Sequence, residues 1–164
     1  AMAEANPHID PAQYPIDQIV LDTKGIEGCN PQRFEFRLLD SVLCSDPEKN
    51  LLVAHRHVPE DDFWTRGHFP GRPLMPGVLM LEALAQAACV HSFMQFERPE
   101  GKVIGLGGVE KARFRDSVEP GTDLWVAGTM ERYSAPRAYL KWVGYILKAN
   151  GSLVCEGTVI GIGI

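Results

Sequence analysis

Two side chains in this sequence are well suited to proton transfer, a histidine and a glutamate that follow one another closely. His68 lies in a segment rich in glycine and proline, and Glu82 lies on the apolar stretch that comes next. Three prolines fix the φ angle within the first segment, so we expect His68 to be held rather than free in solvent. A histidine and a buried carboxyl group are a natural general base and general acid.

The apolar stretch that carries Glu82 predicts a helix over residues 77–95. It contains no proline or glycine after Gly77, and alanine and leucine predominate. The stretch is apolar nearly all round, which is typical of a helix buried in a core. Glu82 and Gln86 are one turn apart and share a face. A glutamate in such surroundings is usually paired or functional.

Each of the two residues also has an ordinary structural interpretation. A histidine after a glycine is commonly a surface or capping residue, and a buried glutamate can bond to a neighbouring strand. Their occurrence together, with a stiffened loop and a helix start between them, favours the functional interpretation.

The residues around this pair resemble a known family. Residues 67–87 are similar to the signature of bacterial (3R)-3-hydroxyacyl-acyl-carrier-protein dehydratases, and residues 108–121 also resemble that family. A third stretch, residues 31–40, is similar but degraded, because Gln32 and Glu35 replace a histidine and a proline that the family usually has there. The resemblance extends over about residues 31–160.

The resemblance implies a function and a mechanism. A glutamate rather than an aspartate at position 82 favours the dehydratase-only branch over the related dehydratase/isomerase branch. His68 would remove the α-proton of a 3-hydroxyacyl thioester, Glu82 would protonate the departing hydroxyl, and the N–H of Gly77 would bind the thioester carbonyl. The products would be a trans-2-enoyl thioester and water, and no cofactor or metal is expected. Substrate-binding residues are expected at Phe69, Pro76, Gln86 and Gly105.

The family also implies an α+β hot-dog fold, an antiparallel sheet wrapped around one long buried helix. In the family the histidine and the glutamate of one site come from different subunits. We therefore expect at least a homodimer, with a trimer of dimers as a further assembly. The expected partner is an acyl carrier protein whose 4'-phosphopantetheine arm holds the acyl chain.

One departure from the family concerns the acyl channel. Family members commonly have a Tyr-Phe pair where this chain has Gly105-Leu106. Because glycine has no side chain, we expect a roomier or less gated channel at Gly105, unless an aromatic ring from elsewhere replaces the tyrosine. A β-bulge that needs glycine is the alternative explanation.

A basic cluster gives a candidate surface for the carrier protein. In a strand, Lys111, Arg113 and Arg115 would share one face, with Ala112 and Phe114 on the other. The cluster is either a solvated strand face or a landing site for an acidic carrier, where charge would aid encounter and specificity. The net charge of −5 argues against nucleic acid as a partner.

Length and composition predict an ordinary cytoplasmic enzyme of 164 residues, with a polar arm at residues 1–14 and one domain at 15–164. No uncharged apolar run approaches about 18 residues, so no membrane span is expected, and no secretory signal is visible. The four cysteines show no paired spacing and are expected to be reduced. His55 and His57 lack a third ligand at a persuasive spacing, so we predict no metal site.

Turn signals divide the rest of the chain into a short helix and a meander of strands. The helix is expected at residues 15–21, where Pro15 starts it, and it ends near Gly25. The expected strands are at about residues 33–43, 51–58, 102–115, 122–133, 137–148 and 152–160. Because most of the strands follow the long helix in succession, they predict an antiparallel sheet.

Two other functions fit the same pattern. The first is another hot-dog enzyme, either a thioesterase or a dehydratase of a specialised lipid or polyketide pathway. The second is a non-catalytic acyl-carrier-binding protein. The presence of both His68 and Glu82 argues against the second.

Overall fold

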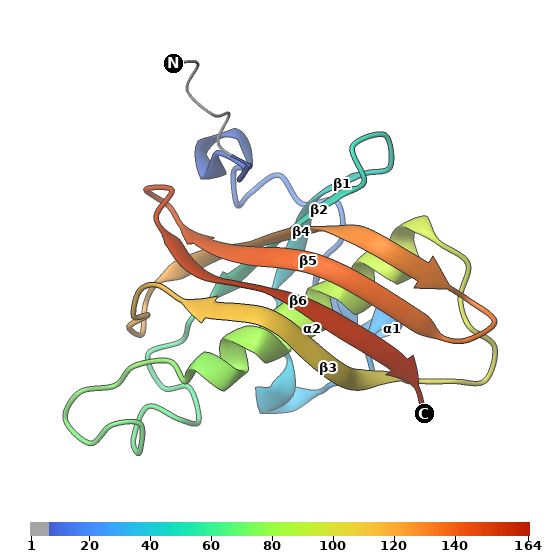
Figure 1. The fold of residues 1–164 in the computed structure, drawn as a ribbon. Coiled ribbons are helices and arrows are strands. Elements are labelled where there is room, and N and C mark those ends of the chain that lie inside the picture. The colour runs from blue at the N-terminus through green and yellow to red at the C-terminus, as the bar shows by residue number, and fades with distance from the viewer. Residues whose placement is uncertain (1–6) are drawn as a thin grey trace.

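A six-stranded antiparallel sheet curls around one long helix in the computed structural model, which describes residues 7–164 (Figure 1). The strand order is β1-β2-β4-β5-β6-β3, so β1 and β3 are the edge strands. This is the hot-dog arrangement expected from the sequence. The helices, in chain order, are η1 (Pro11–Gln13), α1 (Thr23–Cys29), η2 (Phe34–Phe36) and α2 (Gly77–Gln95). The strands are β1 (Ser41–Asp46), β2 (Leu51–His57), β3 (Ile104–Phe114), β4 (Asp123–Ser134), β5 (Tyr139–Lys148) and β6 (Leu153–Gly163).

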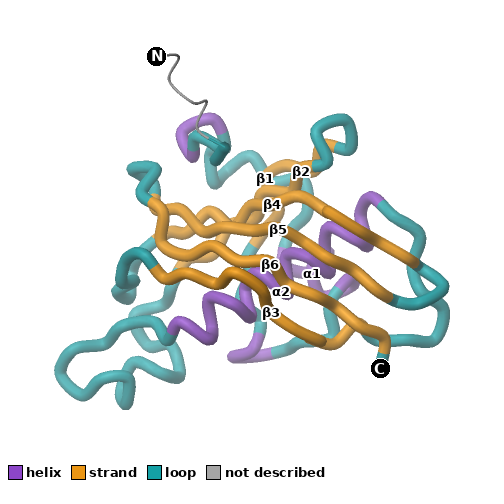
Figure 2. Tube along the Cα trace, in the orientation of Figure 1, coloured by secondary structure: helices purple, strands orange, loops and turns teal. Residues whose placement is uncertain are grey.

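The helix α2 has the bounds predicted from the sequence and lies inside the curl of the sheet (Figure 2). Its length and hydropathy are those of a membrane-spanning helix, but ten of its 19 residues are buried within the protein. It packs against β4, β5 and β6. The helix is therefore the core of the hot-dog fold, and its apolar character is explained by the sheet around it.

The strand expected at residues 33–43 begins only at Ser41. The residues before it form η2 and an extended segment that crosses α2. This segment gives its backbone groups to Gln86, because Gln86 donates to the carbonyl of Phe36 and accepts from the N–H of Leu38. Phe36 and Leu38 therefore bond to the helix rather than to a neighbouring strand. The other five expected strands are confirmed within a few residues at each end.

The helix expected at residues 15–21 is wrong. That segment forms turns, and the N–H groups of Val20 and Leu21 donate to the carbonyl of Val42 in β1. The helix begins later, at Thr23, because the Asp22 side chain accepts from the N–H of Gly25 and caps the first turn. The helix start is therefore set by the Asp22 cap rather than by Pro15.

Residues 7–14 of the expected arm pack on the face of the sheet that points away from α2. The Tyr14 carbonyl accepts from the Trp125 indole at 2.9 Å, and the Ile9 N–H donates to the Tyr145 hydroxyl at 3.0 Å. Ile9, Tyr14 and Trp125 belong to a second, smaller hydrophobic cluster on this face. Residues 1–6 lie outside the described residues, and the division of the chain at residue 14 stays a prediction.

A buried polar network joins the far end of α2 to the sheet. His91 is fully buried; its Nδ1 accepts from the Trp142 indole at 2.8 Å, and its Nε2 lies 2.9 Å from Gln95 Oε1. Gln95 in turn donates to Ser45 Oγ. Burial lowers the pKa of His91, which keeps the ring neutral and able to accept from Trp142. This histidine therefore has a structural role.

Candidate active site

The loop between β2 and α2 holds His68 by its backbone and by its ring. The N–H of His68 donates to the Trp64 carbonyl, and the His68 carbonyl accepts from the N–H of Leu74, both at 2.8 Å. The ring Nδ1 lies 2.7 Å from the Leu74 carbonyl oxygen. Because a carbonyl can only accept, Nδ1 carries the hydrogen, and Nε2 of the neutral ring is left as the proton acceptor. The ring is half-buried, and this hydrogen bond fixes its orientation.

Glu82 lies on α2 with its carboxyl group held by two amides. Its Oε1 accepts from Gln86 Nε2 at 2.9 Å and from Gln32 Nε2 at 3.4 Å. Gln86 is only 2% exposed, and it is itself fixed by the backbone of Phe36 and Leu38. The segment that crosses α2 therefore orients the carboxyl group through Gln86. Gln32 is a contact that the sequence analysis did not predict, although its place in the degraded third stretch was a signal.

The carboxyl group of Glu82 borders a cavity of about 400 Å³, counting its open mouth. Apart from Glu82 and Gln32, the cavity is lined by apolar residues and by backbone of α2, β3, β5 and β6. These are Ala85, Ala88, Cys89, Ile104, Gly105, Leu106, Leu140, Val159, Ile160 and Gly161. Burial raises the pKa of the Cys89 thiol to about 12, so this wall also stays uncharged. The carboxyl group of Glu82 thus lies at the edge of a largely apolar cavity.

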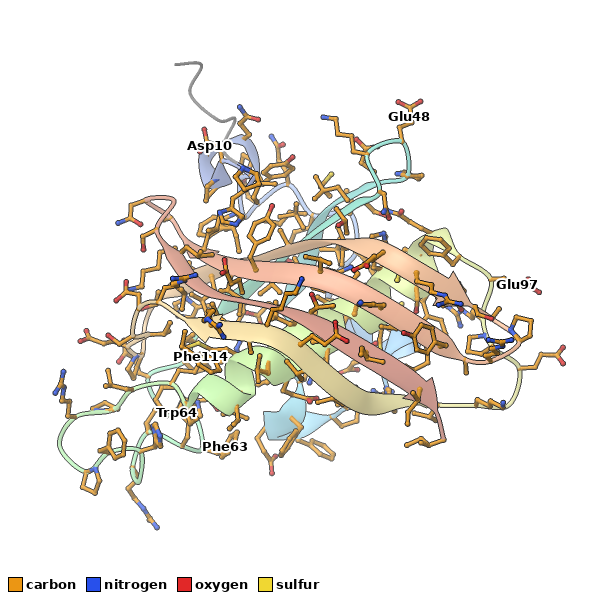
Figure 3. The ribbon with its side chains drawn as sticks, in the orientation of Figure 1. Asp10, Glu48, Phe63, Trp64, Glu97 and Phe114 are labelled. Atoms are coloured by element: carbon orange, nitrogen blue, oxygen red, sulfur yellow. The ribbon has the colours of Figure 1, made fainter. Side chains whose placement is uncertain are left out.

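Within one chain, His68 does not line the cavity that Glu82 borders. No hydrogen bond or ion pair joins the two side chains among residues 7–164. The loop that carries His68 extends past the N-terminal end of α2 (Figure 1). In Figure 3, Phe63 and Trp64 of this loop lie at the same end of the molecule as Phe114, the last residue of β3.

Gly77 begins α2 without a side-chain cap. The first N–H groups of such a helix are open to an oxygen that carries negative charge. A Cβ at position 77 would lie 2.9 Å from Cε1 of Phe114, so the ring of Phe114 covers this point closely. A larger residue at position 77 would require the half-exposed Phe114 ring to shift.

Two further predicted substrate residues, Phe69 and Pro76, lie beside His68 and the start of α2. Phe69 stacks on His68 with ring centroids 4.1 Å apart, and Pro76 precedes the first turn of α2. Neither residue lines the Glu82 cavity, so both belong with the His68 loop.

The structure gives the direction that a side chain at position 105 would take within one chain. Gly105 lines the cavity, but a Cβ built on it would lie 2.9 Å from Cδ1 of Ile164. Ile164 is not among the cavity residues, so a side chain at 105 would leave the cavity rather than enter it. Successive residues of a strand point to opposite faces, and it is Leu106 that closes this wall. A roomier channel at Gly105 therefore stays a prediction, and within one chain the wall of this cavity is formed by Leu106.

The basic cluster lies on the face of β3 away from α2. Glu110 and Arg113 are opposite Thr158 and Glu156 of β6, with a bulge between them. The bulge brings Glu110 to the same face as the cations, which simple alternation did not predict. Arg115 bonds to Glu156 at 2.9 Å, whereas Lys111 and Arg113 have no ion pair within the described part of the chain. Two of the three cations are therefore available to a partner.

The histidines considered as metal ligands bond to a carboxylate instead. His55 Nε2 and His57 Nδ1 lie 2.8 and 3.0 Å from the same oxygen of Asp123. Residues 7–164 contain no group of three or more His, Cys, Asp or Glu side chains arranged to hold a metal ion.

Comparison with known proteins gives consistent matches along most of the chain. Residues 30–160 match the sequence model of the FabA-like domain. The chain is 39% identical over 127 residues to the 3-hydroxyacyl-[acyl-carrier-protein] dehydratase FabZ of Desulfotalea psychrophila, covering 77% of this chain and 84% of that protein. It is 36% identical over 131 residues to the protein of the same name from Escherichia coli O9:H4, covering 79% and 84% of the two chains.

Two solved structures share the fold. The dehydratase heterocomplex ApeI:P from Xenorhabdus doucetiae superposes with a TM-score of 0.67 at 16% identity, over 85% of this chain and 90% of that chain. A putative thioesterase related to phenylacetic acid degradation, from Ralstonia eutropha, superposes with a TM-score of 0.56 at 18% identity, over 74% and 82% of the chains. These likenesses confirm the hot-dog architecture.

Proposed function

The chain belongs to the FabA-like family, and we propose that it is a hydro-lyase that dehydrates (3R)-3-hydroxyacyl thioesters on acyl carrier protein. The product is a trans-2-enoyl thioester for fatty-acid or related lipid synthesis in the cytoplasm. The observation that carries the proposal is the carboxyl group of Glu82, fixed by Gln86 at the wall of an apolar cavity. An acyl chain in this cavity would bring its β-hydroxyl close to that carboxyl group.

The mechanism assigns one proton transfer to each side chain. His68 Nε2 takes the α-proton, since Nδ1 already donates to the Leu74 carbonyl. The N–H of Gly77, at the positive end of α2, stabilises the negative charge that develops on the thioester oxygen. Glu82 donates its proton to the β-hydroxyl, the C–O bond breaks, and water leaves. The α-carbon electron pair forms the double bond, so the reaction needs no redox partner.

His68 does not line the Glu82 cavity of its own chain, and this supports a site made by two chains. Among residues 7–164 no strand pairs with the outer side of the edge strand β3, and an open edge is a template for another strand. Leu106 and Phe114 of β3 are each 51% exposed, and Val78 of α2 is 72% exposed. We propose that a second copy covers these residues, so that each site takes His68 from one subunit and Glu82 from the other.

The variants His68→Ala and Glu82→Gln should each lose about 10²- to 10⁴-fold in dehydration rate, because each lacks one proton-transfer group. The assay follows enoyl absorbance and the mass of the carrier-bound acyl group. The control is Glu100→Gln, an exposed residue outside the site. A variant rate within threefold of the parent would contradict the role assigned to that residue, and release of the carrier arm instead of water would indicate a thioesterase.

We also propose that Lys111 and Arg113 receive the acidic carrier protein, with Arg115 already paired to Glu156. The double variant Lys111→Glu/Arg113→Glu should raise the KM for carrier-bound substrate by about tenfold, the loss expected for ~1.4 kcal/mol of encounter energy. The KM for a short pantetheine thioester should not change. Equal losses on both substrates would indicate damage to the site itself. The matched control is Lys24→Glu, which reverses the charge of an exposed lysine elsewhere on the chain.

The variant Leu106→Trp should shorten the acyl chain that the enzyme accepts, because Leu106 lines the cavity while the side chain at position 105 leaves it. Turnover of a long acyl substrate should fall at least tenfold relative to a four-carbon one, and Gly105→Ala should keep the parent preference. The measurement is kcat/KM over a series of chain lengths. If Gly105→Ala changed the chain-length preference more than Leu106→Trp did, position 105 rather than position 106 would form the cavity wall.

A further inference from the structure

Arg56, an arginine of strand β2, is buried and ion-paired. Arg56 of β2 is 5% exposed, and its Nη2 lies 2.7 Å from Oδ2 of Asp62, whose side chain is also 5% exposed. Removing both charges from water costs free energy, and a well-packed apolar pair is often as stable as a buried ion pair. Stability alone is therefore a weak reason for such a pair, and its contacts suggest a more specific one.

The carboxylate end of this pair organises the loop that holds His68. Asp62 Oδ1 accepts from the N–H of Phe63, and the Asp62 carbonyl accepts from both the N–H and the hydroxyl of Thr65. The turn continues to Trp64, whose carbonyl accepts from the N–H of His68 at 2.8 Å. The anchored aspartate thus begins a series of turns that ends at the histidine.

The guanidinium end organises the segment that holds Glu82. Arg56 Nη1 donates to the Arg37 carbonyl at 3.1 Å. Arg37 lies between Phe36 and Leu38, the two residues whose backbone groups bond to Gln86. Gln86 in turn donates to the carboxyl group of Glu82 at 2.9 Å. One buried side chain therefore reaches the supports of both candidate catalytic groups.

We propose that Arg56, paired with Asp62, is a positioning residue for the dehydration. It fixes the His68 loop and the segment that orients Glu82 to the same point of β2. The inference rests on the proposed function, because it assigns a consequence for turnover to this geometry. In the two-chain site, one chain gives His68 to one centre and Glu82 to the other, so each Arg56 ties together the two centres of a dimer.

The test removes the pair while retaining the fold. The double variant Arg56→Met/Asp62→Leu replaces the ion pair by apolar side chains, and Asp62→Asn keeps the shape of the aspartate without its charge. The matched control is Asp61→Asn, at the exposed acidic neighbour. Each is assayed as the full chain for kcat, KM and thermal unfolding, and the ¹⁵N signals of the His68 imidazole are recorded.

We expect the double variant and Asp62→Asn to lose about tenfold or more in kcat, since a misplacement of about 1 Å can cost 10²-fold. KM should stay within threefold and the double variant should keep a Tm close to the parent. The ¹⁵N signals of His68 should change from the Nδ1–H form towards a mixture of tautomers, and Asp61→Asn should match the parent in all four measurements.

Parent-like kcat and parent-like His68 signals in a folded variant would overturn the proposal. If the double variant does not fold, Asp62→Asn gives the same two readouts. A parent protein that fails to dehydrate 3-hydroxyacyl substrates would contradict the proposed function alone, because the tautomer signals of His68 would still report whether Arg56 and Asp62 position the ring.

Discussion

The site depends on the burial of a glutamine on an apolar helix. The Gln86 side chain is 2% exposed, and its amide has to find partners because an unsatisfied buried amide costs about 1–3 kcal/mol in proteins. It finds them in the backbone of Phe36 and Leu38 and in the carboxyl group of Glu82. The backbone of Gln86 takes part as well, since its carbonyl accepts from the Asn30 side chain. The segment that crosses α2 is therefore bonded to the helix.

This requirement explains why the first strand, β1, begins only at Ser41. Phe36 and Leu38, which would otherwise extend the edge strand β1, form hydrogen bonds with Gln86 of the helix. Gln86 in turn orients the carboxyl group of Glu82. The same segment meets Arg56 at the Arg37 carbonyl, and the loop of His68 meets Arg56 through Asp62. The supports of the two groups, His68 in the loop before α2 and Glu82 on α2, therefore meet at Arg56.

The fold could be predicted to a large extent because its signals are local. The Ala- and Leu-rich run of α2 and turns such as Asn150-Gly151 fix where elements begin and end. The wrong predictions have a common physical cause: at these positions, partners that the sequence pattern does not show determine the local structure. Phe36 and Leu38 look like strand but bond to Gln86, and Asp22 rather than Pro15 starts the first α-helix.

The candidate site was predictable in its residue types more than in its geometry. His68, Glu82, Gln86 and Gly77 stand in one continuous stretch, so their nearness in sequence made them visible. The direction of the Cβ at Gly105 depends on register against β6, and the pairing of Arg115 with Glu156 depends on β6 as well. The ion pair of Arg56 and Asp62 could not be predicted, because the sequence does not distinguish a buried arginine from an exposed one.

The central claim is that His68 and Glu82 act together from different chains. Inactive His68→Ala and Glu82→Gln proteins are mixed, dissociated and reassociated, and the fraction of mixed dimers is measured by mass spectrometry with different tags. Each mixed dimer then has one site with both native groups and one with neither. The account predicts that dehydration returns in proportion to the mixed dimers, to about half of the parent rate per mixed dimer by this count of sites. Mixed dimers that form and stay inactive would show that both groups act within one chain, and would contradict the account.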